Sequence, residues 1–439
     1  MQDSEFRIED ASGYAGNASR LIAPASEAEL LGIIGAGTPI TIVGARTGLT
    51  GGCVPQGGWA VSLEKFQRLD ICPGRAIVGP GVSLDALQTA ASRTGQFYAP
   101  DPTERTASIG GTIATNASGS RSFRYASTRR HILRLRVALM DGRVLDVRRG
   151  DRIDFDVPAL PLPQTTKNTA GYPLAPGMDW IDLFTGSEGT LGIVTEAEVQ
   201  LLPAPRDVLA GVVFFETDTA ALDAVDAWRD IDGLRMIEYF DANSLALLRQ
   251  RFSETPEHSG AALLMEQENG DIDSWADRVS DNSWFAASDQ DRERFRRFRH
   301  ALPELVNDTM RHRGFLKLGS DYAVPIARNR EMLGFYHSEL ERRSLGYVIF
   351  GHVGDAHVHV NILPKSRVDF DAGQSLLLDF ARHAVQLGGT VSAEHGLGKR
   401  KAHLLALQYS SEQIESMRAV KRRLDPQWLL NRGNLFATP

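Results

Sequence analysis

In the second half of the chain, short apolar runs of strand length alternate with amphipathic runs of helical spacing. Five short runs predict strands: "LAGVVFFE" (209–216), "RMIEYFD" (235–241), "AALLMEQE" (261–268), "YVIFGH" (347–352) and "VHVNILP" (358–364). Two amphipathic runs predict helices: "DTAALDAVDAWRDI" (218–231) and "NREMLGFYHSELERR" (329–343). This order of elements predicts an antiparallel sheet covered by helices.

The first half of the chain has a different pattern, in which short β-branched runs are set against glycine loops. Four stretches show it: "TPITIVGARTGLTGGCVP" (38–55), "RAIVGPGVSLDALQTAASRTG" (75–95), "ASIGGTIATNASGS" (107–120) and "LFTGSEGTLGIVTEAEVQLLP" (183–203). Of the 41 glycines, 25 fall in the first 200 residues. Because glycine allows tight turns and close approach of the backbone to a ligand, this half is predicted to enclose one.

These loops do not fit the common nucleotide-binding motifs. None reads G-x-x-x-x-G-K-[ST]. After "GARTGLTGG" (44–52), Glu64 follows "WAVSL" about 20 positions on, but it opens a basic helix-like segment and does not end a second strand as the dinucleotide-binding motif requires. The interpretation that remains is a large anionic ligand lying on several loops, whose backbone N–H groups donate to a pyrophosphate.

The pattern divides the chain into three parts. Residues 1–205 form a first α+β domain that ends at the proline-rich "LLPAPR", residues 206–390 form the sheet domain, and residues 391–439 form a carboxyl-terminal segment. The tail "SSEQIESMRAVKRRLDPQWLLNRGNLF" is predicted to be helical and to fold back onto the first domain.

Charge and cysteine content exclude several classes of function. The formal net charge of −7 argues against a nucleic-acid binder, and the basic run "RRHILRLR" (129–136) is interpreted as one solvated strand face. Only Cys53 and Cys72 occur, with no C-x-x-C, which argues against an iron–sulfur cluster, a cysteine zinc site and a disulfide framework. Any electrons that the protein handles are therefore expected to pass through an organic cofactor. No apolar run is long enough for a membrane span, so a cytoplasmic protein is expected.

The stretch "FGHVGDAHVHVNILP" (350–364) places histidines in a predicted hairpin. With the turn centred on residues 354–355, alternation puts His357, His359 and Asn361 on one face, and His352 lies opposite His357 and diagonal to His359, roughly 5–8 Å away. About 35 residues later "AEHG" supplies a carboxylate. Two imidazoles and a carboxylate suit Zn²⁺, Mn²⁺ or Fe²⁺ and leave positions open for substrate, while hydrogen-bonded histidines without a metal are the alternative.

Seven motifs in register resemble those of the FAD-dependent D-2-hydroxy-acid dehydrogenases, which include D-lactate and D-2-hydroxyglutarate dehydrogenases and the glycolate oxidase D subunit. They are "GARTGLTGG", "PDPTERTASIGGTIATNASG", "KNTAGY", "GSEGTLGIVTE", "GHVGDAHVHVN", "SAEHGLGKRK" and "LDPQWLLNRGNLF". The resemblance runs from about residue 20 to the carboxyl terminus. It implies an α+β fold: a two-subdomain FAD-binding domain of the vanillyl-alcohol oxidase type, an antiparallel-sheet substrate domain and a helical carboxyl-terminal segment.

The resemblance also implies which residues hold FAD. The pyrophosphate loop would use Arg46, Thr47, Gly48, Leu49, Gly51 and Gly52. The isoalloxazine and ribityl would be flanked by Pro100, Asp101, Thr103, Ile109, Gly110, Gly111, Thr115, Asn116, Ala117 and Gly119. The adenosine end would be lined by Glu188, Gly189, Gly192, Ile193 and Val194, with Asn431 from the last motif as a further contact. Non-covalent FAD is expected because loop 44–52 has no histidine, although Cys53 lies one residue beyond it.

The chemistry would be carried by the second and third parts of the chain. His352, His359 and Glu394 match the metal ligands of the metal-dependent members. The family often has Gly-Asn in place of Ala356-His357, so His357 would be an extra polar neighbour, with a competing ligand as the less favoured alternative. A divalent metal, with Zn²⁺ favoured over Mn²⁺ or Fe²⁺, would lower the pKa of the substrate hydroxyl, and His395 would act as the catalytic base. The substrate-binding residues would be Arg299 for the carboxylate, Asn361, and Lys317 as a weaker candidate.

The expected function is oxidation of a D-2-hydroxy acid such as D-lactate, D-2-hydroxyglutarate or glycolate to the 2-oxo acid, with hydride transfer to flavin N5. The expected partners are the small hydroxy acid and an electron acceptor such as a cytochrome, a quinone or an electron-transfer flavoprotein, with a homodimer as one allowed assembly. Two alternatives stay open: a non-redox FAD enzyme of the same fold, of the ether-lipid synthase type, and a flavin-binding subunit of a larger oxidase complex.

Overall fold

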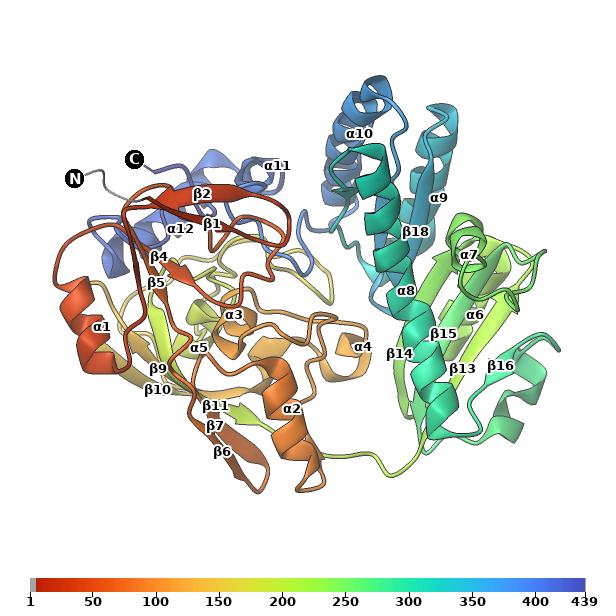
Figure 1. Cartoon of the computed structure of the whole chain (residues 1–439), viewed down its shortest axis with the longest axis horizontal. Coiled ribbons are helices and arrows are strands. Elements are labelled where there is room, and N and C mark those ends of the chain that lie inside the picture. The colour runs from red at the N-terminus through yellow and green to blue at the C-terminus, as the bar shows by residue number, and fades with distance from the viewer. Residues whose placement is uncertain (1–4, 439) are drawn as a thin grey trace.

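The structure, a computed structural model, describes residues 5–438 and has two regions that lie side by side (Figure 1). The first region contains a three-stranded parallel sheet of order β3-β5-β4 and a five-stranded antiparallel sheet of order β10-β9-β11-β7-β6. The second region contains a seven-stranded sheet of order β16-β13-β15-β14-β18-β19-β17. This mixed architecture confirms the predicted α+β fold.

The parallel sheet positions the glycine loop at 44–52. Its strands are β3 (Arg20–Ile22), β4 (Ile40–Val43) and β5 (Trp59–Ser62). Helix α1 (Glu27–Ile34) connects β3 to β4 and packs Leu30 and Ile34 against buried Ile40. The loop therefore begins at the carboxyl end of a buried parallel strand, where ligands commonly bind.

The five-stranded sheet provides the other wall of the first region. Its strands are β6 (Leu69–Cys72), β7 (Arg75–Val78), β9 (Ile132–Ala138), β10 (Val144–Arg148) and β11 (Ile193–Gln200). In β9 Leu135 and Val137 are buried, whereas Arg134 and Arg136 pair with carboxylates. Of the basic run at 129–136, Arg134 and Arg136 lie on one face of β9, whereas Arg129, Arg130 and His131 precede the strand in a 3-10 helix. The interpretation as one solvated strand face is therefore correct only in part, and His131 is buried.

Short elements complete the first region. The strands are β1 (Phe6–Glu9), β2 (Ala15–Ala18), β8 (Gln96–Phe97) and β12 (Leu202–Pro203). The helices are α2 (Leu84–Ser92), α3 (Ile109–Ala114), α4 (Ser122–Tyr125) and α5 (Trp180–Phe184).

All five strands predicted in the second half lie in the seven-stranded sheet. They are β13 (Val208–Phe215), β14 (Leu234–Asp241), β15 (Ala261–Glu268), β18 (Tyr347–His352) and β19 (His357–Ile362), and the short strands β16 (Trp284–Phe285) and β17 (Leu318–Gly319) form the edges. Neighbouring strands pair antiparallel throughout. The predicted antiparallel sheet is confirmed.

Helices cover both faces of this sheet. Helices α6 (Asp218–Trp228), α9 (Asn329–Arg342) and α10 (Arg367–Gln386) share one apolar cluster with one face, and α7 (Ala242–Leu248) and α8 (Asp289–Arg313) share a second cluster with the other. On the α8 face, buried Val348 and Phe350 are followed at the next position of that face by His352. The α8 face therefore changes from apolar to polar at one end of the sheet, and the candidate site begins there.

The carboxyl-terminal segment returns to the first region, where both ends of the described chain lie (Figure 1). Helices α11 (Leu405–Gln408) and α12 (Ser411–Leu424) account for its helical part. The predicted helix is wrong beyond residue 424, because Pro426 disfavours helical backbone at Asp425 and has no N–H to donate. Instead, Leu430 forms a parallel bridge with Ile40 of β4. Within residues 5–438, no helix has the length and apolar character of a membrane span.

Candidate active site

The loop at residues 44–52 presents a row of free backbone donors. In the described chain, the N–H groups of Ala45 to Thr50 donate to no protein acceptor, and most of these residues are exposed. The chain turns here through Arg46, whose φ of 61° is left-handed. Consecutive unpaired N–H groups at the end of a buried strand form an anion-binding concavity, which fits a pyrophosphate.

A second loop stands opposite the first, around α3. Gly44 and Gly110 allow close contact: a Cβ at Gly44 would lie 2.6 Å from Ser108 Oγ, and one at Gly110 would lie 2.6 Å from Pro80 Cβ. A Cβ at Gly119 would lie 2.0 Å from the carbonyl oxygen of Asp101, so the backbones of the two predicted flavin loops touch at this point. These positions require glycine because of protein packing, and they bring residues 100–103 and 115–119 together.

The residues predicted for the adenosine end are mostly packed against protein. The Glu188 carboxylate accepts hydrogen bonds from Leu397 N and Gly398 N at 2.7 Å, and burial raises its pKa to about 7. Asn431 accepts from Ile42 N (2.8 Å) and donates to the Glu188 carbonyl (3.0 Å). Their side chains join the carboxyl-terminal segment to the FAD-binding loops. Gly189, Gly192, Ile193 and Val194 follow Glu188 into β11, with Ile193 in a hydrophobic core.

The predicted hairpin exists and brings its histidines together. Strands β18 and β19 pair His352 with His357, and the ring centroid of His359 lies 5.5 Å from that of His352 and 4.6 Å from that of His357. Glu394 reaches the same point from the loop after α10. One potential ligand atom from each of these four residues lies within 4.8 Å of the others. We call these four residues the His/Glu group; its donors are of the type that Zn²⁺, Mn²⁺ and Fe²⁺ accept.

Buried charges hold the His/Glu group in place. His352 Nδ1 donates to Glu238 Oε1 (2.5 Å), and its Nε2 lies 3.3 Å from Glu394 Oε2. Burial alone would lower the pKa of His352, but the two carboxylates outweigh burial and raise it. Lys167 Nζ donates to Glu394 Oε1 (2.6 Å). Burial would raise the pKa of Glu394, but the charges of His352 and Lys167 outweigh burial and lower this pKa well below its usual value. Such outer contacts are typical of residues that ligate metals.

Sequence reasoning missed these outer residues. Glu238 is a buried acid in the middle of an apolar strand, and that exception to the pattern was a usable signal. Lys167 opens the motif "KNTAGY", whereas Asp321 lies outside all seven motifs, and a single buried charge has no periodicity that would reveal its partner. Asp321 is fully buried and accepts from Ser392 Oγ (2.8 Å) and His395 N (2.9 Å).

His395 lies next to the His/Glu group. Its ring stacks on that of His359 with centroids 5.5 Å apart, and its Nδ1 is 3.6 Å from Asp321 Oδ1. Burial lowers its pKa, with Asp321 opposing the effect. About a quarter of its side chain remains exposed. His395 is therefore more accessible than the neighbouring imidazole of His352, and burial favours its neutral form.

The structure connects Arg299 to the same cluster. Its Nε donates to Glu238 Oε2 (3.0 Å) and its Nη1 to Thr103 Oγ1 (2.8 Å), so it bridges the predicted flavin loop and the carboxylate that holds His352. Lys317 and Asn361 flank Gly319: a Cβ there would lie 3.6 Å from Lys317 Cε and 3.4 Å from Asn361 Oδ1. Desolvation and, to a lesser degree, Lys401 lower the pKa of Lys317 to about 8.

Comparison with known proteins identifies the family. The family described as FAD linked oxidases, C-terminal domain, matches residues 204–435, and the family described as FAD binding domain matches residues 18–148. The chain belongs to the FAD-linked oxidases. A D-lactate dehydrogenase from Archaeoglobus fulgidus is 31% identical over 90% of this chain and 86% of the relative. The glycolate oxidase subunit GlcD of Bacillus subtilis is 29% identical over 91% of this chain and 84% of the relative.

A solved structure supports the fold of this FAD-linked oxidase. An alkyldihydroxyacetonephosphate synthase matches with a TM-score of 0.68 at 16% sequence identity, over 94% of this chain and 75% of the synthase. At that identity the likeness concerns the fold alone. The match to the FAD binding domain family and the unpaired amides of loop 44–52 both support FAD as the cofactor.

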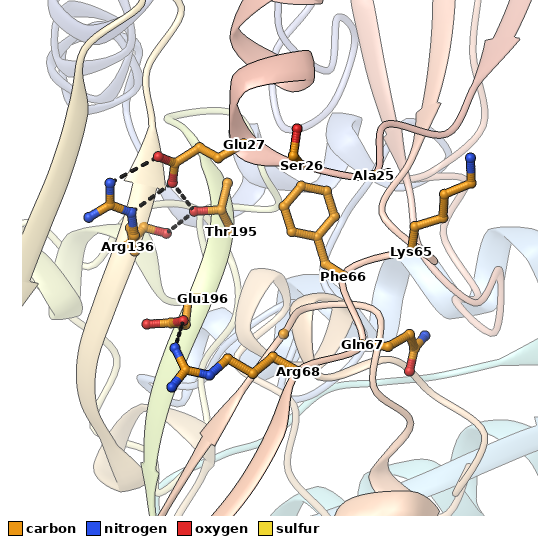
Figure 2. Close-up of a pocket in the computed structure, with 11 residues that line it drawn as sticks. Ala25, Ser26, Glu27, Lys65, Phe66, Gln67, Arg68, Arg136, Thr195 and Glu196 are labelled. Carbon is orange, nitrogen blue, oxygen red and sulfur yellow. Dashed lines mark hydrogen bonds and ion pairs between the residues drawn. The ribbon is translucent and has the colours of Figure 1, made fainter.

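A surface hollow of about 350 Å³ lies away from the His/Glu group in this FAD-linked oxidase (Figure 2). It opens between α1, residues 65–68 and strands β9 and β11. Its charged side chains already pair: Arg136 with Glu27 at 2.8 Å, and Arg68 with Glu196 at 2.7 Å. None of the predicted site residues lines it, so the hollow is not assigned to the reaction.

Proposed function

We propose that the protein is an FAD-dependent dehydrogenase that oxidises a D-2-hydroxy acid to the 2-oxo acid with the help of a divalent metal. The observation that carries this proposal is the position of the His/Glu group beside a predicted flavin loop. Ser118 Oγ donates to Glu394 Oε1 (2.9 Å), and Lys167 Nζ donates both to Glu394 and to the Gly119 carbonyl (3.0 Å). A substrate at this group would be next to the isoalloxazine.

The substrate class rests on the relatives and on the charges of the site. The names of the two curated relatives refer to D-lactate and glycolate, which are both 2-hydroxy acids. Arg299 and Lys317 offer positive charge for a carboxylate, and the planar guanidinium of Arg299 suits it better than an ammonium group does. Arg299 uses Nε and Nη1 within the protein, and in the described chain its Nη2 makes no hydrogen bond.

Each proposed residue has a distinct task. When bound, FAD accepts a hydride and the divalent metal supplies Lewis acidity toward the substrate hydroxyl. His395 takes the hydroxyl proton as the general base. Arg299 binds the carboxylate, and Asn361 donates a hydrogen bond to the substrate. His352, His359 and Glu394 would hold the metal, and Glu238 and Lys167 keep two of those ligands oriented.

We further propose that FAD is bound without a covalent link. Loop 44–52 contains no histidine or cysteine, and burial, followed by the charge of Asp10, raises the pKa of Cys53 to about 11. A thiol that stays protonated is a poor nucleophile. Flavin should therefore leave the polypeptide when it is denatured by acid or heat, and flavin that stays attached would redirect attention to Cys53.

The test is anaerobic flavin reduction by candidate substrates. Purified holoenzyme is mixed with D-lactate, glycolate, D-malate or D-2-hydroxyglutarate, with and without a chelator, and bleaching of the flavin is followed. We expect at least one acid to bleach the flavin and the chelator to stop it. No bleaching by any acid would favour the non-redox alternative or a subunit that needs a complex. The same preparation, reoxidised by a cytochrome, a quinone or an electron-transfer flavoprotein, identifies the acceptor.

We also propose that substrate binding and FAD binding belong to separate parts of the chain, divided near residues 205 and 390. The family described as FAD linked oxidases, C-terminal domain, begins at residue 204, next to the first boundary, and the FAD binding domain family ends before it, at residue 148. Limited proteolysis near residue 205 that releases two folded fragments would support this division.

A further inference from the structure

We infer that His357 is a fourth protein ligand of the metal, beside His352, His359 and Glu394. The inference rests on the proposed function, since it concerns the same metal. It starts from the His/Glu group, in which His357 is one of the four residues whose potential ligand atoms lie close together.

The position of His357 is that of a ligand. It is fully buried, and one of its ring nitrogens belongs to the set of atoms within 4.8 Å of one another in the His/Glu group. An ion with bonds of about 2.1 Å holds opposite ligands about 4.2 Å apart. A modest contraction of the group is therefore enough for all four residues to reach one ion.

The second ring nitrogen of each histidine gives the stronger argument. Metal-bound imidazoles direct their other nitrogen to an oxygen acceptor outside the site. His352 Nδ1 faces Glu238 (2.5 Å), and His359 Nδ1 faces the Ser320 carbonyl (3.2 Å). His357 Nε2 lies 3.2 Å from Asp321 Oδ1, at ion-pair distance though off the hydrogen-bond direction. Each of the three imidazoles thus directs one ring nitrogen toward an oxygen atom, which accepts a hydrogen bond from His352 and His359 only.

The other ring nitrogen of His357, Nδ1, has no partner of this kind. In the described chain it makes no hydrogen bond, although it is shielded from water. A buried polar atom without a partner destabilises the folded protein. Ligation of a metal through Nδ1 would remove that destabilisation while Nε2 stays on Asp321.

The fourth ligand changes which metal suits the site. With three imidazoles and Glu394, a four-coordinate Zn²⁺ has no position left for substrate. A six-coordinate Mn²⁺ or Fe²⁺ keeps two positions, which match the hydroxyl and one carboxylate oxygen of a 2-hydroxy acid. We therefore infer Mn²⁺ or Fe²⁺ as the working ion of this chain.

X-ray absorption spectroscopy of the holoenzyme counts the imidazoles directly. Protein stripped by a chelator is reloaded with one equivalent of Mn²⁺, and the coordinated histidines are counted in the wild-type chain, in His357→Asn and in His337→Asn. His337 lies on α9, 3.0 Å from the Tyr347 hydroxyl, and serves as the matched control. We expect three imidazoles in the wild type and the control, and two in His357→Asn.

Chelator competition gives a second readout. We expect the Kd for Mn²⁺ to rise at least ~10-fold in His357→Asn and to stay unchanged in His337→Asn, because removal of an outer-shell partner alone costs about 10- to 100-fold. Two imidazoles in the wild type would overturn the inference and keep the proposed three-ligand site, even if His357→Asn did not fold. A wild-type holoenzyme that is fully active and binds no metal would overturn the proposed metal chemistry itself.

Discussion

The FAD-binding loop and the His/Glu group bind their partners with different parts of the chain. Loop 44–52 offers the backbone N–H groups of Ala45 to Thr50, and its side chains are largely exposed. The His/Glu group offers side chains only, and buried residues such as Glu238 and Lys167 hold them by hydrogen bonds. A substitution in the first site leaves its donors in place, whereas a substitution in the second removes them.

This difference predicts separate failures of the two sites. The His/Glu group contacts the first region through hydrogen bonds to Glu394, which accepts from Ser118 and from Lys167. Loss of a metal ligand should therefore spare FAD, and changes to side chains in loop 44–52 should spare the metal. Loss of FAD from a metal-ligand variant, or loss of metal from a loop variant, would show that the two sites are not independent.

The largest expected effect is loss of the metal through His359→Ala. His359 is a central member of the group, because its ring lies against those of His352, His357 and His395. Removal of Lewis acidity worth several kcal/mol should lower the rate of flavin reduction by at least ~10³-fold. FAD content, read from absorbance, should stay at the wild-type level. Stoichiometric metal in this variant would contradict the assignment.

Loss of the base should be smaller and should separate metal from proton transfer. His395→Ala should keep its metal and lose about 10²- to 10⁴-fold in the rate of flavin reduction. Metal analysis and stopped-flow bleaching of the same preparation check both parts. A variant that loses its metal as well would mean that His395 is itself a ligand, as its place near Asp321 and His359 allows.

Sequence reasoning was effective for the features that repeat. Five of the seven strands of the sheet followed from apolar runs of strand length, and the meeting of His352, His357 and His359 followed from alternation on a hairpin. The role of Glu238 was not predicted, because its contact with His352 depends on which strand lies beside β18. That strand, β14, is more than 100 residues away in sequence. The end of α12 was predicted wrongly, because a single proline stops the helix although the helical pattern continues. Non-local pairing and local backbone exceptions are the two things that periodicity does not encode.

Substitution of Arg299 tests the substrate side of the comparison. Arg299→Lys keeps the charge but loses the planar fork that reaches both Glu238 and Thr103. The loss of one charged hydrogen bond, about 1.5–3 kcal/mol, predicts a fall in kcat/KM of about 10- to 150-fold. FAD and metal contents should not change. A fall of less than twofold would move the carboxylate anchor to Lys317 or elsewhere.

Glu238→Gln tests whether outer residues matter to the His/Glu group. Burial would raise the pKa of the Glu238 carboxyl, but His352 and Arg299 lower it to about 2, so Glu238 is charged. The amide of the substituted side chain would still reach His352 Nδ1 but would carry no charge. Metal affinity should fall about 10- to 100-fold by chelator competition. Glu104→Gln, at an exposed glutamate of the first region, is the control and should change nothing. Equal affinities in both variants would show that His352 needs no carboxylate partner.

The smallest effect should come from Arg46→Ala in the FAD-binding loop. Arg46 is exposed, so its charge should contribute no more than about 1 kcal/mol to binding a phosphate, and the backbone donors remain after the substitution. Alanine tolerates the left-handed φ of 61° no better than arginine does, so the loop keeps its path at similar cost. We expect the Kd for FAD, measured by fluorescence quenching on reconstitution of the apoprotein, to rise less than about fivefold. A rise above about 50-fold would mean that the side chain, and not the row of amides, holds the pyrophosphate, and the contrast between the two sites would fail.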